Sequence, residues 1–217
     1  EEEKEEEKEE EKEEEKEEEK EEKGEEEEKG EEDIEKMKYT SKEFIKQIPT
    51  QVPTMFNEDV IFMFYSKSKD VDPGKGTGEK LPKDLIPEYA ELKKIKDWRK
   101  MLSNFYIAPF KLDGKEWNSV EHYYQGSKFK KENPEFYHQF SLDSGSELSK
   151  DPNMAKSAGG KTGKVNGKNF RPKTVSADAD FFSKESNRMN EEMYLAQYAK
   201  FTNASNNKDK EELRNVL

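Results

Sequence analysis

The pattern of apolar and polar positions along the chain predicts short strands followed by longer helices. Val60–Tyr65 is an unbroken apolar run of β-forming residues with polar neighbours, which is typical of a buried strand. Two further segments, Phe105–Leu112 and Lys115–Trp117, flank Asp113 and Gly114, a dipeptide favoured in two-residue hairpin turns. These segments predict a small amount of β-structure.

Helical patterns dominate the second half of the chain. Ser119 is a favourable N-cap for a helix that runs to about Lys131 and stops before Pro134. Apolar residues at spacings of three and four predict a second helix over Ser186–Phe201, and Asp209–Leu217 begins a third. The fold class expected is α+β and predominantly helical, with a few short strands.

Charge divides the chain into unequal parts. Residues 1–32 hold 23 Glu and 7 Lys, a net charge of −16, whereas the whole chain carries −12. All 24 aromatic residues follow this segment. We therefore expect an acidic tail at residues 1–36, disordered or a lone helix, then a linker at 37–59 and a single domain at 60–217. A solvated tail is favoured over an acidic arm that binds a basic partner.

Composition also excludes several classes of protein. The chain has no cysteine and two histidines, so neither a disulfide framework nor a zinc site built from Cys or His is expected. No apolar run approaches the ~20 residues that a membrane-spanning helix needs. The N-terminus has no apolar signal-peptide core. A cytoplasmic protein without a membrane partner is expected.

Two stretches rich in Gly, Pro and Lys, at residues 66–88 and 156–173, predict long loops. Such loops suit phosphate groups, with Ser66 and Lys67 in the first and Lys156 and Gly160 in the second. Solvated surface loops are an equally weighted alternative. Ala155–Thr162 approaches a P-loop, but the residues before it do not form a strand and glycines after it would break a helix. The NTPase interpretation is therefore disfavoured.

The helix after Ser119 carries the candidate chemistry. Glu121, Gln125 and Lys128 are spaced four and three residues apart, so they share one helical face. Glu121 lies in the first turn, where the helix dipole favours the ionised carboxylate and hence a base or a stabiliser of positive charge. A solvent-facing polar stripe is the alternative that spacing alone favours.

A wider set of motifs surrounds this helix, and it is densest between Leu102 and Phe129. More widely spaced members of this set lie at Phe64–Ser66, at Ala155–Lys156 and at Lys200–Phe201 with Met193. This set resembles the NADAR (YbiA-like) family over roughly residues 60–217. The dense part consists of Leu102–Tyr106, Pro109–Phe110, Leu112–Gly114, Trp117, Ser119–Gln125 and Lys128–Phe129.

The resemblance implies a YbiA-like fold and hydrolysis of the N-glycosidic bond between a phosphorylated ribose and its base, without a metal or an organic cofactor. The implied substrates are small nucleotide sugars of the ADP-ribose or ribosylamino-pyrimidine type, or an ADP-ribosylated nucleic-acid base. Glu121 would be the principal carboxylate, and Lys128, which would also line the site, or an acid from elsewhere could supply the proton for the leaving base. The implied binding residues are Asn104, Trp117 and Gln125.

Asp178 and Asp180 are a second acidic candidate, although Phe181 follows Asp180 where the family often has Trp, and an exposed pair of loop residues is an equally weighted alternative. Members of the family extend further than this chain, which therefore looks short at its C-terminal end. An inactive module that binds ADP-ribose or a nucleotide is the alternative function. The sequence does not indicate an oligomeric state.

Overall fold

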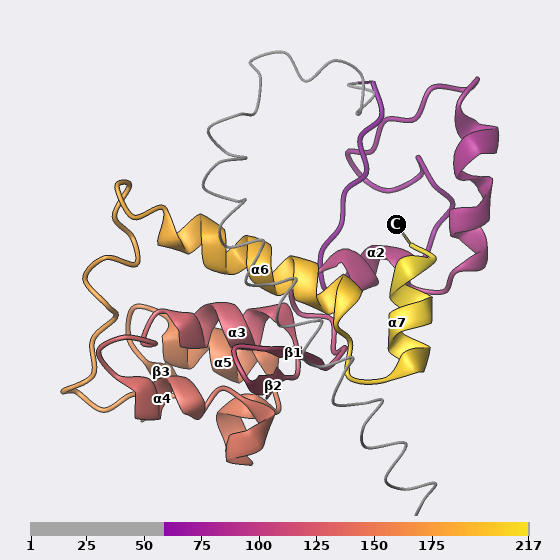
Figure 1. Ribbon diagram of the computed structural model, residues 1–217. Coiled ribbons are helices and arrows are strands. Elements are labelled where there is room, and N and C mark those ends of the chain that lie inside the picture. Colours follow the sequence, from indigo (N-terminus) through magenta and orange to yellow (C-terminus); the bar gives the residue numbers. More distant parts are fainter. Residues whose placement is uncertain (1–58, 217) are drawn as a thin grey trace, which may run out of the picture. The chain divides into compact units, whose positions relative to one another are not determined.

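The computed structural model describes residues 59–216. The acidic tail and nearly all of the linker predicted before residue 60 lie outside the described residues. The described part is α+β and predominantly helical, as predicted (Figure 1). Its elements are η1 (Ile86–Lys94), α2 (Trp98–Leu102), β1 (Phe110–Leu112), β2 (Lys115–Trp117), α3 (Val120–Ser127), α4 (Pro134–His138), η2 (Leu142–Ser144), η3 (Glu147–Ser149), α5 (Pro152–Gly159), β3 (Lys164–Val165), β4 (Lys168–Asn169), α6 (Arg188–Thr202) and α7 (Asn207–Arg214).

The predicted hairpin is confirmed, but its first strand is shorter than expected. β1 and β2 pair antiparallel, with Phe110 opposite Trp117, and the strand begins only at Phe110. Asp113 and Gly114 have φ values of 56° and 62°, which are the positive values that this type of turn requires. The indole N–H of Trp117 donates to the carbonyl of Leu112 at 2.8 Å and closes the hairpin.

α3 begins where predicted but ends four residues early, at Ser127. The carbonyl of Ser127 accepts a hydrogen bond from Arg188 at 2.6 Å, and that of Lys128 accepts one from the Asp178 N–H at 2.7 Å. Residues distant in sequence thus supply hydrogen bonds to the carbonyls at this end. The hydroxyl of Ser119 bonds to His122 Nδ1 at 2.8 Å and does not cap the helix.

The two C-terminal helices are confirmed with shifted starts. α6 starts at Arg188, two residues after the predicted start, and buries Leu195, Ala196 and Ala199. α7 starts two residues before the predicted start and is capped by Asn206, whose side chain accepts from the Asp209 N–H at 2.8 Å. α3 packs against both α5 and α6 (Figure 1).

The prediction of a buried strand over Val60–Tyr65 is wrong. Only Ile61 forms a bridge, with Lys80, and Tyr65 is 61% exposed. The Met63 N–H donates to the Glu79 carboxylate at 3.3 Å and the Tyr65 N–H to the Ser68 hydroxyl at 2.9 Å. Because side chains satisfy these backbone donors, no ladder extends along the segment.

Residues 66–88 are irregular up to the start of η1, as predicted, and a buried ion pair organises them. The Glu79 carboxylate accepts from the Gly74 and Gly76 N–H groups and from the guanidinium of Arg99 at 2.6 Å. Arg99 also donates to the carbonyl of Val71 at 2.6 Å. One carboxylate thus holds the loop to α2.

The loop predicted over 156–173 is only partly right. Its first residues belong to α5, which Asp151 caps and Pro152 opens, a helix-start signal that the prediction missed. The β3–β4 hairpin follows, with Asn166 and Gly167 at its turn. Lys161 therefore follows a helix and precedes a hairpin, whereas a P-loop follows a strand and opens a helix.

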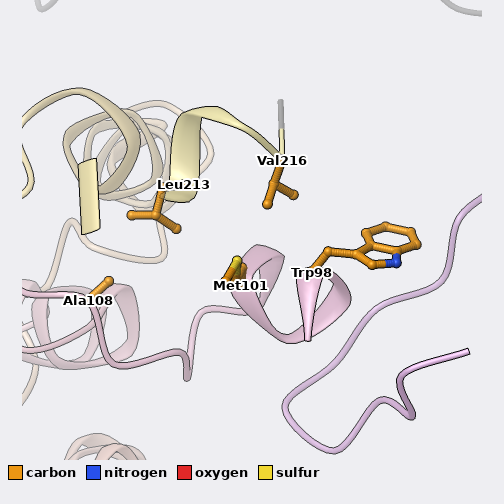
Figure 2. Packing of buried hydrophobic residues seen from close by; sticks show 5 residues of the cluster. All are labelled: Trp98, Met101, Ala108, Leu213 and Val216. Carbon is orange, nitrogen blue, oxygen red and sulfur yellow. The ribbon is translucent and has the colours of Figure 1, made fainter. Parts of the chain in front are cut away.

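A small apolar cluster joins α2 to the C-terminal helix (Figure 2). Trp98 and Met101 of α2 pack with Ala108, Leu213 and Val216. Burial of this cluster fixes α7 next to α2. Within residues 59–216, no helix has both the length and the apolar character that crossing a bilayer requires.

Candidate active site

Three side chains of α3 form one buried hydrogen-bonded chain. The amide nitrogen of Gln125 donates to Glu121 Oε1 at 2.8 Å, and Lys128 Nζ donates to Gln125 Oε1 at 2.5 Å. Glu121, Gln125 and Lys128 are 5%, 6% and 8% exposed. The shared helical face predicted from their spacing is therefore turned inward, and they do not form a solvent-facing stripe.

α5 approaches this chain closely at a glycine. A Cβ at position 159 would lie 2.3 Å from Gln125 Oε1, so only glycine permits this separation of α5 and α3. The carbonyl of Gly159 accepts from Lys128 Nζ at 3.2 Å. The ammonium of Lys128 is thus held by one acceptor from each helix.

Burial shifts the carboxylate and the ammonium toward their neutral forms. It raises the pKa of Glu121, although the hydrogen bond from Gln125 and the charges of Lys156 and Lys128 act in the opposite direction. It lowers the pKa of Lys128, assisted by the charge of Arg171 and opposed by Glu121. The expectation that the helix dipole favours ionisation of Glu121 missed this burial, which the sequence did not reveal.

Asn104 lies beside the start of α3 and is linked to α6. Its carbonyl accepts from the Glu121 N–H at 2.9 Å. Its side-chain amide accepts a short hydrogen bond from Gln197 and donates to the sulfur of Met193 at 3.4 Å. Sequence reasoning missed Gln197, which follows Met193 by four residues and therefore shares its face of α6.

Aromatic rings flank the buried chain. Lys128 Nζ lies 5.3 Å from the ring centre of Tyr124 and 5.9 Å from that of Phe182. Lys156, exposed on α5, lies 5.3 Å from the ring centre of Phe105. Sequence reasoning passed over Phe182 because nothing in the pattern separates it from its buried neighbour Phe181.

Three predicted site residues make contacts that support the fold. Trp117 is fully buried and makes an edge contact with Tyr123, so its ring belongs to the core. Asp180 is bound by the side chains of Lys131 and Arg188. Gly160 is the C-cap of α5, where a Cβ would lie 3.0 Å from the carbonyl oxygen of Lys156.

Ser66 and Lys67 are exposed in a turn that the Ser68 N–H closes on the carbonyl of Tyr65 at 3.0 Å. They are exposed to solvent, whereas the chain of Glu121, Gln125 and Lys128 on α3 is buried.

A buried polar network holds α3 to α6. The hydroxyl of Tyr123 contacts Asp113 at the hairpin turn and Glu192 on α6. Arg188, at the start of α6, contacts Asp178 at 2.8 Å and, within the same helix, Glu192 at 3.4 Å. This network fixes the helix that carries Glu121.

His122 is fully buried, and burial lowers its pKa to about 4. Among the described residues, its Nε2 and the indole N–H of Trp98 are buried without a hydrogen-bond partner. Within the same part of the chain, no group of three or more His, Asp or Glu side chains is placed to hold a metal ion.

No protein-family model and no curated protein matches this chain. Among solved structures, it is similar to the NMR structure of the E. coli protein YbiA, with 27% sequence identity and a TM-score of 0.35. The similarity covers 56% of this chain and 55% of that one. The chain therefore spans about half the length of YbiA.

Proposed function

We propose that this chain is an N-glycosidase that cleaves the bond between a phosphorylated ribose and its base. The observation that carries the proposal is the buried chain of Glu121, Gln125 and Lys128, which joins a carboxylate to an ammonium through one amide. The resemblance of Leu102–Phe129 to the NADAR family supports the same chemistry. ADP-ribose and ribosylamino-pyrimidine conjugates are the substrates to test first.

The two charged groups suit the two halves of this reaction. When the C1′–N bond breaks, its electron pair goes to the base nitrogen, which takes a proton from Lys128. Positive charge then develops on the sugar, and Glu121 stabilises it. Glu121 also takes a proton from the water that attacks C1′, and the products are the free base and the ribose with a new hydroxyl group.

The directions of both pKa shifts favour Lys128 as the acid and Glu121 as the base. A lowered pKa makes the ammonium of Lys128 a better acid, and a raised pKa makes the carboxylate of Glu121 a better base. Gln125 orients both groups, because its amide donates to one and accepts from the other.

Glu121→Gln tests the proposal. The purified chain is incubated with ADP-ribosylated guanine nucleosides and with ribosylamino-pyrimidine phosphates, and the freed base is measured by chromatography. We expect the variant to lose about 10²-fold or more in kcat while it keeps its affinity for substrate. Glu135→Gln, at an exposed position on α4, is the control and should retain activity.

An inactive module that binds a nucleotide sugar is the alternative. The hydrogen bonds among Glu121, Gln125 and Lys128 themselves favour it, because they occupy groups that catalysis would have to release. Calorimetry showing binding, together with no base release by the unsubstituted chain, would select this alternative.

A further inference from the structure

Two lysines whose charges act on Glu121 each lie beside aromatic rings. Lys128 lies over the rings of Tyr124 and Phe182, and Lys156 lies over the ring of Phe105. The charges of both lysines act on Glu121 and favour its ionised form. A substrate that reacts at Glu121 would therefore lie near two cations, each with an aromatic ring beside it.

The two lysines offer different chemistry. Lys128 is buried and donates to Gln125 and Gly159, which leaves one of its three N–H groups for a ligand. Lys156 is exposed and forms no salt bridge with any of residues 59–216. A single directed donor beside rings suits a planar base, whereas an exposed cation suits a phosphate.

Phe182 presents its ring to solvent from a fixed position. It is 60% exposed, while the adjoining Phe181 is fully buried. The two rings meet edge to face at 5.0 Å, and Phe181 is held in turn by Tyr124 at 5.7 Å and by Arg188 at 5.4 Å. The buried ring thus anchors the exposed one next to the ammonium of Lys128.

We propose that Phe182 and Tyr124 are the specificity-determining residues that receive the base, and that Lys156 receives the phosphate of the ribose. The substrate then lies across Glu121 with its base toward Lys128. The base is a planar aromatic ring, which stacks on Phe182. Its nitrogen in the C1′–N bond accepts a hydrogen bond from the remaining N–H of Lys128. This inference rests on the proposed function.

Phe182→Ala tests the base side. Stacking of one base on one aromatic ring corresponds to about a tenfold to a hundredfold change in affinity. We expect the dissociation constant for intact substrate to rise by this factor, equally for substrates with and without a phosphate, and Phe182→Trp to restore it. Tyr194→Ala removes a similarly exposed aromatic ring from α6, 47% exposed, and should leave binding unchanged.

Lys156→Ala tests the phosphate side. We expect about a tenfold or greater loss of affinity for the phosphorylated substrate and no loss for its dephosphorylated form. Lys93→Ala, at an exposed position of η1, is the matched control. An equal loss for both substrates, or a loss for neither, would overturn the assignment of the phosphate to Lys156.

Calorimetry in the Glu121→Gln background separates this inference from the proposed function, because it measures binding of uncleaved substrate. Unchanged affinity after Phe182→Ala would refute the base site even if the unsubstituted chain releases base. Absence of base release by the unsubstituted chain would refute the proposed function. A loss of binding on Phe182→Ala would still establish the base site.

Discussion

Replacing Gly159 with alanine should disturb both the packing of α5 on α3 and the candidate active site. The new Cβ would lie 2.3 Å from Gln125 Oε1 and 2.8 Å from Gln125 Cβ, whereas ordinary contact begins near 3.4 Å. The amide end of Gln125 can rotate away from this contact. Its Cβ is attached directly to the α3 backbone, so α5 must also move away from α3.

The size of the effect follows from two opposing contributions. Overpacking of a tight contact costs about 1–3 kcal/mol. A change from glycine to alanine within a helix returns about 0.5–1 kcal/mol. We therefore expect the free energy of unfolding to fall by roughly 1 kcal/mol, within limits of about 0–2.5 kcal/mol. Base release should fall as well, because Gln125 can no longer bridge Glu121 and Lys128.

Urea denaturation of the unsubstituted chain and Gly159→Ala measures the first effect. Ser157→Ala, on the same helix, is the control and should change stability little. In a double-mutant cycle, Gln125→Ala should relieve part of the clash, because the Oε1 atom is removed while the Cβ remains. If Gly159→Ala were as stable as the unsubstituted chain and kept full activity, the close contact between α5 and α3 would be refuted.

Two further predictions concern buried charges. Burial lowers the pKa of Lys200 from 10.5 to about 7, so the unfolded state binds more protons between these values. The free energy of unfolding should therefore rise with pH across this window, by at most about 1.4 kcal/mol per unit, and urea titrations should show a flatter profile for Lys200→Met. Burial opposes ionisation of Glu79, but hydrogen bonds from Arg99 and the Gly76 N–H outweigh it and lower the pKa of Glu79. The contribution of Glu79 to stability is present above pH 4.5 and is lost as the pH falls through the lowered pKa. At pH 7, Glu79→Gln should lower the free energy of unfolding by about 3–5 kcal/mol, measured by thermal or urea unfolding. Glu91→Gln, which removes one partner of an exposed ion pair, should change stability little.

Local patterns were sufficient where neighbours in sequence decide the structure. Asp113 and Gly114 both take the positive φ values that the hairpin turn needs, and the pattern predicted this turn. The spacing of Glu121, Gln125 and Lys128 likewise placed them on one face, because helical geometry depends only on the local backbone. Neither pattern indicated which side of α3 is covered.

Local patterns failed where distant residues compete for the backbone. The apolar run after Asp59 did not become a strand, because Glu79 and Ser68 satisfy its donors at Met63 and Tyr65. The end of α3 moved to Ser127, where Asp178 and Arg188, which lie far along the chain, supply hydrogen bonds. Periodicity is judged over short segments of sequence, so it cannot reveal partners this far along the chain.

For this protein, the sequence alone determined the α+β class, the hairpin turn, the C-terminal helices and the shared face of Glu121, Gln125 and Lys128. Only the tertiary structure decided that this face is buried against Gly159, that the carboxylate and the ammonium shift toward neutrality, and that Phe182 lies exposed beside Lys128. The physical reason is that backbone geometry is local, whereas desolvation and side-chain contact depend on which helices meet.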